Sequence, residues 1–536
     1  MIIAAEQLRT EGGITMPIKI SKTVICKGAL FLLLLISAIW VLHITVRPSA
    51  AGPPYQNRQE EMKRKMQGTP YKSRKEEMRR EMQDRAGGLP PEVLAQQSNE
   101  KVQMPTIDDA VKTALAAAEE AALPLIDTKF HNNGKTITVP DDHKSIQAAI
   151  DAASSGDVVL VKPGTYYELL VMKDGVKVVS DSADGGDELV PVEGAMLKLP
   201  RRALRTIIDG SKSKTSHNGM FDFNPGLGRK AIIDGFTIQN LPAQNHHIPG
   251  HAHALNVRGA SPVITNCLIR NNGSTGIGNH VVYHDQDSPM PKRDFRWANI
   301  KHRASAVIFN NIIYGNLGLG IGCNHFSDPY ILGNEVFNNS DAELGEDPTP
   351  GIGGKHGSAA TIIGNIVHDN PGGGILCKGG ASQGKYQIDR PTHPTIIKNV
   401  VYDNGSSRPG IACNGSGSEK MPVKIIGNYV YYNSELIGIG LQKGPVGIIE
   451  DNMVIGLQKG SVGIIEDNMV AGSKLPGIAV NGSTALRLNR NKVTGTKKAP
   501  GFTVVNDGKV HEMLDNASYS NYGPRFMISN NASVGE

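Results

Sequence analysis

A ten-residue unit with asparagine at a fixed place recurs along the chain and limits what it can fold into. The copies are VITNCLIRNN, VIFNNIIYGN, YILGNEVFNN, TIIGNIVHDN, TIIKNVVYDN and KIIGNYVYYN, starting at residues 263, 307, 330, 361, 395 and 424. Each copy is rich in strand-forming apolar residues that keep the same phase. Such a repeat is typical of a solenoid, in which each coil stacks on its neighbours. We expect the asparagine amides to stack from coil to coil, each bonding the next.

A second unit, beginning Gly-Ile, lies between copies of the first. It starts at residues 276, 320, 351, 374, 410, 438 and 477. The unequal spacing fits one coil with loops of varying length, and glycine permits the tight corners. Two nearly identical stretches, 440–455 and 456–471, are only 16 residues long. We therefore expect a locally irregular coil there.

The segment ITVPDDHKSIQAAIDAASSGDVVLVKPGTYYE, residues 137–168, combines a short strand, an amphipathic helix and an apolar strand. It closely resembles the N-terminal cap of right-handed parallel β-helix proteins, the pectate-lyase-like superfamily. The resemblance implies an all-β, right-handed parallel β-helix over residues 137–510, with the helix at 143–155 covering its open hydrophobic end. No motif of a specific lyase or epimerase family is present, so the resemblance concerns the fold.

The flanking segments differ in character from the repeats. Residues 1–47 contain ALFLLLLISAIWVLHITV (29–46), 18 residues without a formal charge. This run predicts a single membrane anchor or, alternatively, a long signal peptide, and with either one an extracytoplasmic protein, periplasmic or on the cell surface. Residues 48–136 predict a polar helical stalk, because 54–69 and 70–85 repeat a charged helical pattern. Residues 511–536 are expected to form a C-terminal cap or tail.

Charge and cysteine usage argue against several classes of protein. The chain has 56 basic and 51 acidic residues, a net charge of +5, which gives little support for nucleic-acid binding. Its five cysteines show no CxxC spacing, so a zinc ribbon or a thioredoxin-like site is not expected.

Strand alternation assigns the residues of the Gly-Ile unit to two faces. If the isoleucine points inward, so does the residue two positions later, which places Cys323, Cys377 and Cys413 in the core. The residue one position after the isoleucine then points outward and is often glycine, which predicts a floor of nearly bare backbone. The residue three positions after it forms an outward polar ridge. Its members are Arg258, His280, Asn324, Lys355, Lys378, Asn414, Gln442 and Asn481.

This ridge favours an acidic polysaccharide as the partner, processed by a lyase or by an epimerase of uronic acids. Both reactions remove the proton α to a carboxylate, which requires a base and neutralisation of the charge that develops. We predict Lys355 as the base, His325 or His356 as the partner acid, and Arg258 and Lys378 as carboxylate clamps. Loops at the rim supply a candidate Ca²⁺ site with the ligands Asp285, Asp287 and Glu346.

Two other functions remain open. Histidine-rich NHHIPGHAH (245–253) supplies His247, His251 and His253 as ligands for Cu or Zn. This would resemble the periplasmic copper-handling β-helix proteins of nitrous oxide reductase maturation. Alternatively, the chain is a non-catalytic cell-surface module that binds glycan or protein. Trp297, in the longest polar insertion, either stacks on a sugar or forms a small satellite core. The oligomeric state is open.

Overall fold

A computed structural model describes residues 105–126 and 134–534, apart from 214–218, 243–252, 284–296, 341–347, 380–387, 406–408 and short gaps between 419 and 532. The predicted apolar segment 29–46 and most of the predicted stalk lie outside the described residues. Among the described residues, none of the helices combines the length and apolar character that crossing a bilayer requires.

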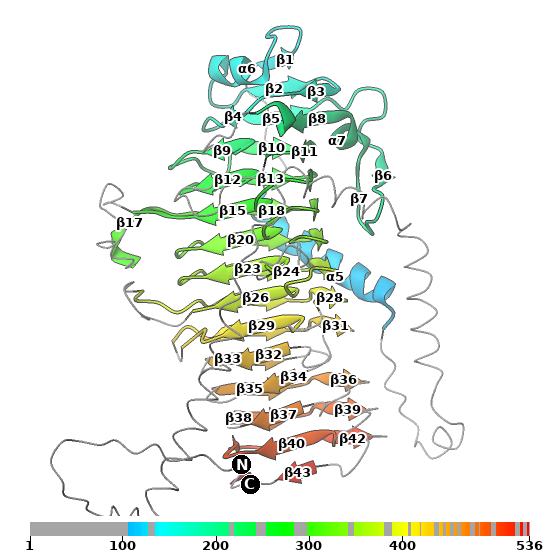
Figure 1. Ribbon diagram of the computed structural model, residues 1–536, viewed down its shortest axis with the longest axis vertical. Helices are drawn as coiled ribbons and strands as arrows, with labels where there is room; N and C mark the ends of the chain where they lie inside the picture. Colours follow the sequence, from blue (N-terminus) through cyan, green and yellow to red (C-terminus); the bar gives the residue numbers. More distant parts are fainter. Residues whose placement is uncertain are drawn as a thin grey trace, which may run out of the picture. The chain divides into compact units, whose positions relative to one another are not determined.

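The repeats form parallel sheets that run along the solenoid, one strand per coil (Figure 1). The first sheet consists of β1 (Thr136–Val139), β2 (Val158–Val161), β5 (Lys177–Ser180), β10 (Ile232–Asp234), β13 (Val263–Thr265), β18 (Val307–Phe309), β21 (Tyr330–Leu332), β24 (Thr361–Ile363), β27 (Thr395–Ile397), β30 (Val423–Ile426), β33 (Val446–Glu450), β35 (Val462–Glu466), β38 (Thr484–Asn489), β41 (Lys509–Val510) and β44 (Ser533–Val534). The ten-residue unit thus begins with a strand of this sheet.

The second sheet takes the other half of the ten-residue unit. It consists of β3 (Gly164–Tyr166), β8 (Thr206–Asp209), β11 (Thr237–Gln239), β14 (Leu268–Arg270), β19 (Ile312–Tyr314), β22 (Glu335–Phe337), β25 (Ile366–His368), β28 (Val400–Tyr402) and β31 (Tyr429–Tyr431). A separate short sheet of β36 (Met469–Ala471), β39 (Lys492–Thr494) and β42 (Ala517–Tyr519) comes after it in the chain.

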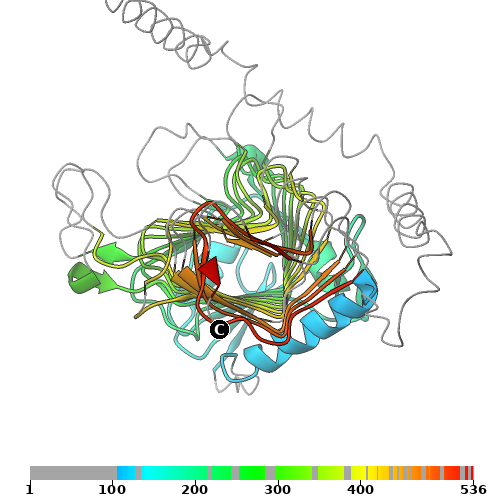
Figure 2. The same ribbon diagram turned by 90° about the horizontal axis from the view of Figure 1, so that it is seen from below.

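The third sheet is built from the Gly-Ile units. It consists of β4 (Leu170–Val171), β9 (Phe221–Phe223), β12 (Leu255–Arg258), β15 (Ile277–His280), β20 (Ile321–Asn324), β23 (Ile352–Lys355), β26 (Ile375–Lys378), β29 (Ile411–Asn414), β32 (Ile439–Gln442), β34 (Ile455–Leu457), β37 (Ile478–Asn481), β40 (Phe502–Val505) and β43 (Phe526–Ile528). The three sheets are the three walls seen along the solenoid in Figure 2. The predicted all-β parallel solenoid is confirmed.

Side-chain alternation in the third sheet follows the prediction. Ile321, Ile352 and Ile375 are fully buried, and so are the thiols two positions after an isoleucine. Cys323, Cys377 and Cys413 are 0 to 2% exposed and free. The outward side chains in between are therefore also correctly assigned.

Buried asparagines form two amide ladders along the solenoid. One runs through Asn311, Asn334, Asn365, Asn399 and Asn428, and the other through Asn272, Asn316, Asn339, Asn370, Asn404 and Asn433. Each side-chain oxygen accepts the amide of the previous coil at about 3 Å, for example 2.9 Å from Asn334 Oδ1 to Asn311 Nδ2. The sequence predicted one such column, whereas the structure contains two, at the fifth and the tenth position of the ten-residue unit.

The N-terminal end is capped as predicted. Helix α6 (Ile146–Ala152) buries Ile146, Ala149 and Ile150 against the first coils. Ser145 caps the helix, and the Glu168 carboxylate accepts the N–H groups of its first two residues at 2.9 and 3.0 Å.

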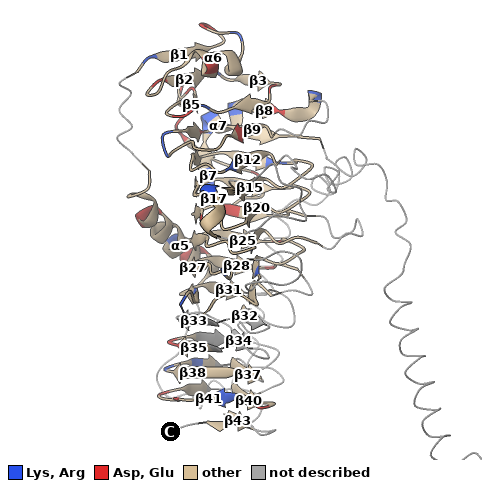
Figure 3. Ribbon diagram, turned by 90° about the vertical axis from the view of Figure 1, so that its left-hand side faces the viewer, with Lys and Arg blue, Asp and Glu red and all other residues tan. Residues whose placement is uncertain are grey.

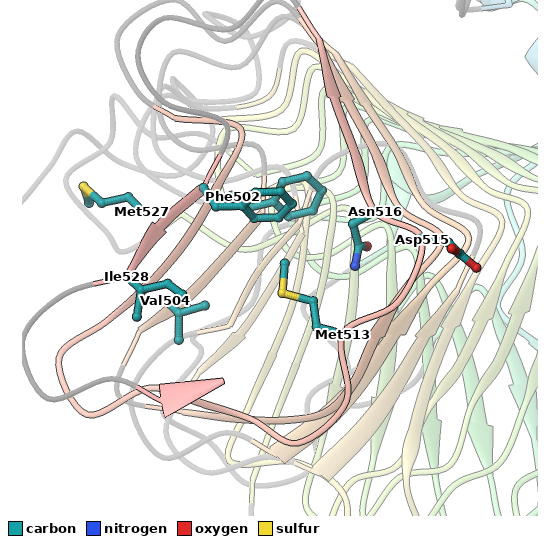
Figure 4. Close-up of a pocket in the computed structure, with 8 residues that line it drawn as sticks. Phe502, Val504, Met513, Asp515, Asn516, Met527 and Ile528 are labelled. Carbon is teal, nitrogen blue, oxygen red and sulfur yellow. The ribbon is translucent and has the colours of Figure 1, made fainter. Parts of the chain in front are cut away.

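The C-terminal end departs from the predicted boundary at residue 510. Strands β41, β43 and β44 continue the first and third sheets, so solenoid pairing extends to Val534. A cavity of about 450 Å³ opens at this end (Figure 4). It is lined by Phe502, Val504, Met513, Asp515, Asn516, Phe526, Met527 and Ile528.

Helix α5 (Ile107–Ala122), in the segment predicted as stalk, packs on the outside of the solenoid (Figures 1 and 2). Its buried stripe consists of Ala110, Ala114, Ala118 and Ala122. It crosses the corner between the first and second sheets at Gly333 and Gly364. A side chain at Gly364 would come within 2.1 Å of the Ala114 carbonyl oxygen. Glycine at this corner permits the close approach.

The 16-residue repeats form the irregular coil that their length predicted. Val446 pairs with Val462 and Glu450 with Glu466, so the two copies stack directly on each other. Within the described residues, the second sheet ends at β31 and the next strand on its side is β36. A coil of 16 residues thus contributes strands β33 and β34 to the other two sheets.

A buried ionic network ties the second sheet to the hairpin of β6 (Leu189–Pro191) and β7 (Lys198–Pro200). The fully buried Glu335 carboxylate accepts the N–H groups of Met196 and Leu197 and bonds His368 Nε2 at 3.0 Å. The His368 ring lies between those of Phe337 and Tyr402, with centroids 4.8 and 4.7 Å away. Burial alone lowers the pKa of His368, but the hydrogen bonds with Asp369 and Glu335 outweigh it and raise the pKa to about 9.

We predict that His368 makes stability fall between pH 6.5 and 9. Its folded-state pKa exceeds its unfolded value, so the contribution is complete below pH 6.5 and is lost as the pH rises through 9. Urea unfolding at pH 6 to 9.5 should show a smaller decline for His368→Phe than for the natural protein. His511→Phe, at an exposed site, is the control. Equal slopes for the natural protein and His368→Phe would contradict the assignment.

Candidate functional site

One polar column follows the ends of the third-sheet strands, which are stacked in successive layers in Figure 3. Strand register pairs successive members, and Asn324 and Lys355 each follow directly after the last recorded pair of β20 and β23, Cys323 with Gly354. We call this column the strip: Arg258, His280, Asn324, Lys355, Lys378 and Asn414. Gln442 continues it. Asn481 does not follow directly, because β34 lies between β32 and β37.

The glycine floor beside the strip is not bare, contrary to the prediction. The ring of His253 lies over Gly278, where an added Cβ would stand 1.8 Å from its Cδ2 atom. The side chain of Leu319 covers Gly353 in the same way, at 2.2 Å. Only at Gly322, of these three, would an added Cβ find no atom nearer than 3.7 Å. Side chains from loops therefore pack into the space that these glycines leave open.

Four histidines form a row along the strip. The Nε2 atoms of His253 and His280 are 2.8 Å apart, and their rings are stacked with centroids 5.0 Å apart. His280 lies 6.3 Å from His325, which stacks on His356 at 4.8 Å. The places of His280, His325 and His356 follow from the strand register, whereas His253 joins them from a loop outside the repeat.

Two of these imidazoles are neutral at neutral pH. Burial lowers the pKa of His280 to about 3, helped by the charges of His325, Lys355 and Arg258. Burial also lowers the pKa of His356 to about 4, with a further contribution from Lys355. Neutral imidazoles can donate an N–H to a substrate without adding positive charge.

Lys355 and Lys378 are direct neighbours on adjacent coils, with aligned Cα atoms in β23 and β26. Both side chains reach solvent. The surrounding protein nevertheless lowers the pKa of Lys355, and the charge of Lys378 lowers it further. Arg258 lies three coils away, about 14 Å along the solenoid. It is therefore further from Lys355 along the strip than Lys378 is.

Asp222 is a candidate that the sequence analysis missed. It occupies the outward position of β9 next to Asn256, whose amide donates to Asp222 Oδ1 at 3.0 Å. Burial raises the pKa of this carboxyl, although Asn256, the Gly219 N–H and Arg258 act in the opposite direction. Aligning FDF with LNVR in the third-sheet register would have placed Asp222 in the floor column.

Trp297 lies beside the strip as part of a packed cluster. It belongs to the insertion that starts with β16 (Val282–Tyr283) and ends with η3 (Trp297–Asn299) and β17 (Ile300–His302). The guanidinium of Arg390 lies 4.1 Å from the indole centroid, and the Phe326 ring meets it edge-on at 5.9 Å. Trp297 thus packs against Phe326 of the main core, and its predicted stacking on a sugar stays a prediction.

The predicted metal ligands fall mostly outside the described part of the chain. Asp285, Asp287, Glu346, His247 and His251 lie outside the described residues, whereas His253 lies beside His280. Among the described residues, no group of three or more His, Cys, Asp or Glu side chains is arranged to hold a metal ion.

Comparison with known proteins supports the fold. Residues 226–390 match the family model described as "Right handed beta helix region". No sequence among the curated proteins matches the chain.

Solved structures with a similar arrangement include an epimerase and a glucanase. The catalytic domain of Agl-KA is 12% identical, covering 82% of this chain and 69% of its own, with a TM-score of 0.44. The A-module of the Azotobacter vinelandii mannuronan C-5 epimerase AlgE6 is 16% identical, covering 73% and 94%, with a TM-score of 0.28. The catalytic unit of a Streptomyces thermodiastaticus GH87 α-1,3-glucanase is 11% identical, covering 73% and 65%, with a TM-score of 0.37. Such values carry no argument about activity.

We predict that NMR titration will find the imidazoles of His280 and His356 neutral at pH 7, with pKa values of about 3 and 4. Lys355→Met removes a nearby positive charge and should raise both values. They should stay below 6.5, because burial, the larger cause, remains. Either imidazole titrating near 6.5 in the native protein would contradict this description of the site.

Proposed function

We propose that this right-handed parallel β-helix protein, which resembles the pectate-lyase-like superfamily, binds an acidic polysaccharide along the strip and removes a proton from a uronic acid unit. The observation that carries the proposal is Lys355, an amine of lowered pKa, with a second lysine on the next coil and two neutral imidazoles, those of His356 and His280, close enough for its charge to affect them. Proton abstraction α to a carboxylate needs such a set: a base, a cation and hydrogen-bond donors.

Each residue has a role in this proposal. The neutral amine of Lys355 accepts the proton on the carbon α to the carboxylate. Lys378, one coil away, pairs with that carboxylate and offsets the charge that develops on it. Arg258 holds the carboxylate of a different sugar unit, because it lies three coils away.

Once the proton has been removed, the reaction can continue as an elimination or as an epimerisation, and the histidines take part in that step. In a lyase reaction the bond to the glycosidic oxygen breaks. That oxygen accepts a hydrogen bond from an N–H of His325 or His356 and takes up a proton from the Lys355 ammonium formed in the first step or from water. Alternatively, a proton returns to the opposite face of the same carbon, which inverts it and is an epimerase reaction. The neutral state of His356 favours its role as an N–H donor rather than as a cation.

The cellular setting and a cofactor belong to the proposal as well. The apolar segment 29–46 supports export and attachment to a membrane. Asp285, Asp287 and Glu346 remain the proposed ligands of Ca²⁺, which would offset the negative charge of substrate carboxylates.

The first test is Lys355→Ala on a panel of polyuronates, with Ca²⁺ and with EDTA. Turnover, followed by unsaturated uronate formation or by epimer ratio, should fall at least ~100-fold with the unfolding transition almost unchanged. In the natural protein, activity should rise with pH through the lowered pKa of Lys355, because only the neutral amine is a base.

Lys424→Ala, an exposed lysine of the first sheet, is the matched control and should retain activity. Full turnover in Lys355→Ala would refute the catalytic assignment. Binding of polyuronates without turnover by the natural protein would favour the non-catalytic module.

A second candidate function is the binding of Cu or Zn. The observation in its favour is the 2.8 Å approach of two imidazole nitrogens, those of His253 and His280. Three cations nearby in the strip oppose a bound metal ion, which makes this the weaker candidate.

Titration calorimetry with Cu²⁺ and Zn²⁺ tests the metal function. We expect His253→Ala to weaken a genuine site at least ~10-fold through the loss of one ligand. His511→Ala, an exposed histidine in the region of the C-terminal strands, should bind as the natural protein does. Equal affinities in all three proteins would exclude a site at His253.

A further inference from the structure

Two turns beside the strip have a left-handed backbone conformation, which one of their residues, Phe326, disfavours. His325 and Phe326, which come directly after β20, have φ values of 50° and 60°. His356 and Gly357, one coil further, have φ values of 55° and 79°. The left-handed region is rare for residues other than glycine, and a bulky residue such as Phe326 is a genuine outlier there. Such turns persist only where the surrounding packing imposes them.

Phe326 connects the two turns. Its backbone N–H donates to the carbonyl oxygen of His356 at 3.0 Å. Its ring is buried, 1% exposed, and lies against Gly357, where an added Cβ would come within 2.2 Å of ring carbons. Since Gly357 directly follows His356, movement of the Phe326 ring would displace the His356 turn.

Trp297 closes the other side of the Phe326 ring. The two rings meet edge-on, with centroids 5.9 Å apart and an interplanar angle of 85°. Trp297 is itself held by a segment between β26 and β27. Its backbone N–H donates to Asp389 Oδ1 at 3.0 Å, and the guanidinium of Arg390 lies over its ring at 4.1 Å. Parts of two insertions, from coils far apart in the sequence, therefore meet at this indole.

A purely structural role for Trp297 would stabilise the insertion and nothing else. The geometry argues for more, because the contacts continue from Trp297 through Phe326 to the turn that carries His356. The imidazoles of His325 and His356 stack with centroids 4.8 Å apart and an interplanar angle of 23°, next to Lys355. Any loosening of the Phe326 ring would separate this pair and admit water between the rings.

We propose that Trp297 is a positioning residue that acts through Phe326 to hold the His325 and His356 turns, and with them the stacked imidazole pair beside Lys355. Its importance for turnover rests on the proposed function. Its effect on the histidines does not, and can be measured in the absence of any substrate.

The test compares Trp297→Ala, the conservative Trp297→Phe and the control Tyr167→Ala by NMR titration of His356. Tyr167 is an exposed ring with Lys212 3.5 Å above it, in the segment between β3 and β4. Burial is the main cause of the low pKa of His356, about 4. Trp297→Ala should therefore raise that pKa by at least one unit, and Trp297→Phe and Tyr167→Ala should leave it near 4.

If Trp297→Ala does not fold, Asp389→Ala tests the same contact with a smaller change to the packing. It removes the acceptor of the Trp297 N–H and should shift the pKa of His356 in the same direction by less. A folded Trp297→Ala protein with His356 still near 4, or an equal shift in Tyr167→Ala, would overturn the proposal.

Kinetics separate the two proposals. If the protein processes polyuronates, Trp297→Ala should lower kcat with little change in KM, and Trp297→Phe should restore most of kcat. Unchanged kcat in Trp297→Ala would overturn the positioning role. Absence of turnover in the natural protein would defeat the proposed function alone, because the titration of His356 would still report on Trp297.

Discussion

Register between coils is the constraint on which the rest of this structure depends. Parallel strands are joined by long connections, so no tight turn fixes which residue faces which. Here the two asparagine ladders fix the register, because their side-chain amides, buried inside the solenoid, bond equivalent residues of neighbouring coils. Each buried amide donates to the next coil and accepts from the previous one. A coil shifted by one residue would leave such amides unpaired, at a cost of about 1–3 kcal/mol each, and would turn the isoleucines and thiols outward.

Fixed register also creates the electrostatics of the strip. Equivalent positions of neighbouring coils are about 4.8 Å apart, so like side chains in one column interact strongly. Lys355 next to Lys378, and imidazole on imidazole, are the result. Burial is the main cause of the lowered pKa values of His280, His356 and Lys355, and the neighbouring charges of the column lower them further.

Side chains from outside the repeat complete this face. Glycine columns beside the strip would have offered bare backbone to a ligand, but His253 and Leu319 occupy two of those places. Beside the strip there is therefore an imidazole on one coil and an apolar side chain on another. A polymer would meet a mixed surface here rather than a row of peptide groups, which suits recognition of particular sugar units along a chain.

The sequence alone determined the solenoid, its N-terminal cap, the buried thiols and the order of residues in the strip. These depend on a period of two along each strand and on a repeat that keeps its phase, both of which are local properties. It located one asparagine column and missed the second, although both lie in the same ten-residue unit. Only the tertiary structure decided which loop side chains reach the strip. His253 over Gly278, Trp297 against Phe326 and the α5 helix over Gly364 are contacts between segments of different coils or outside the repeat. No periodicity governs loop length or direction, so such contacts depend on the packed structure and cannot be read from local patterns.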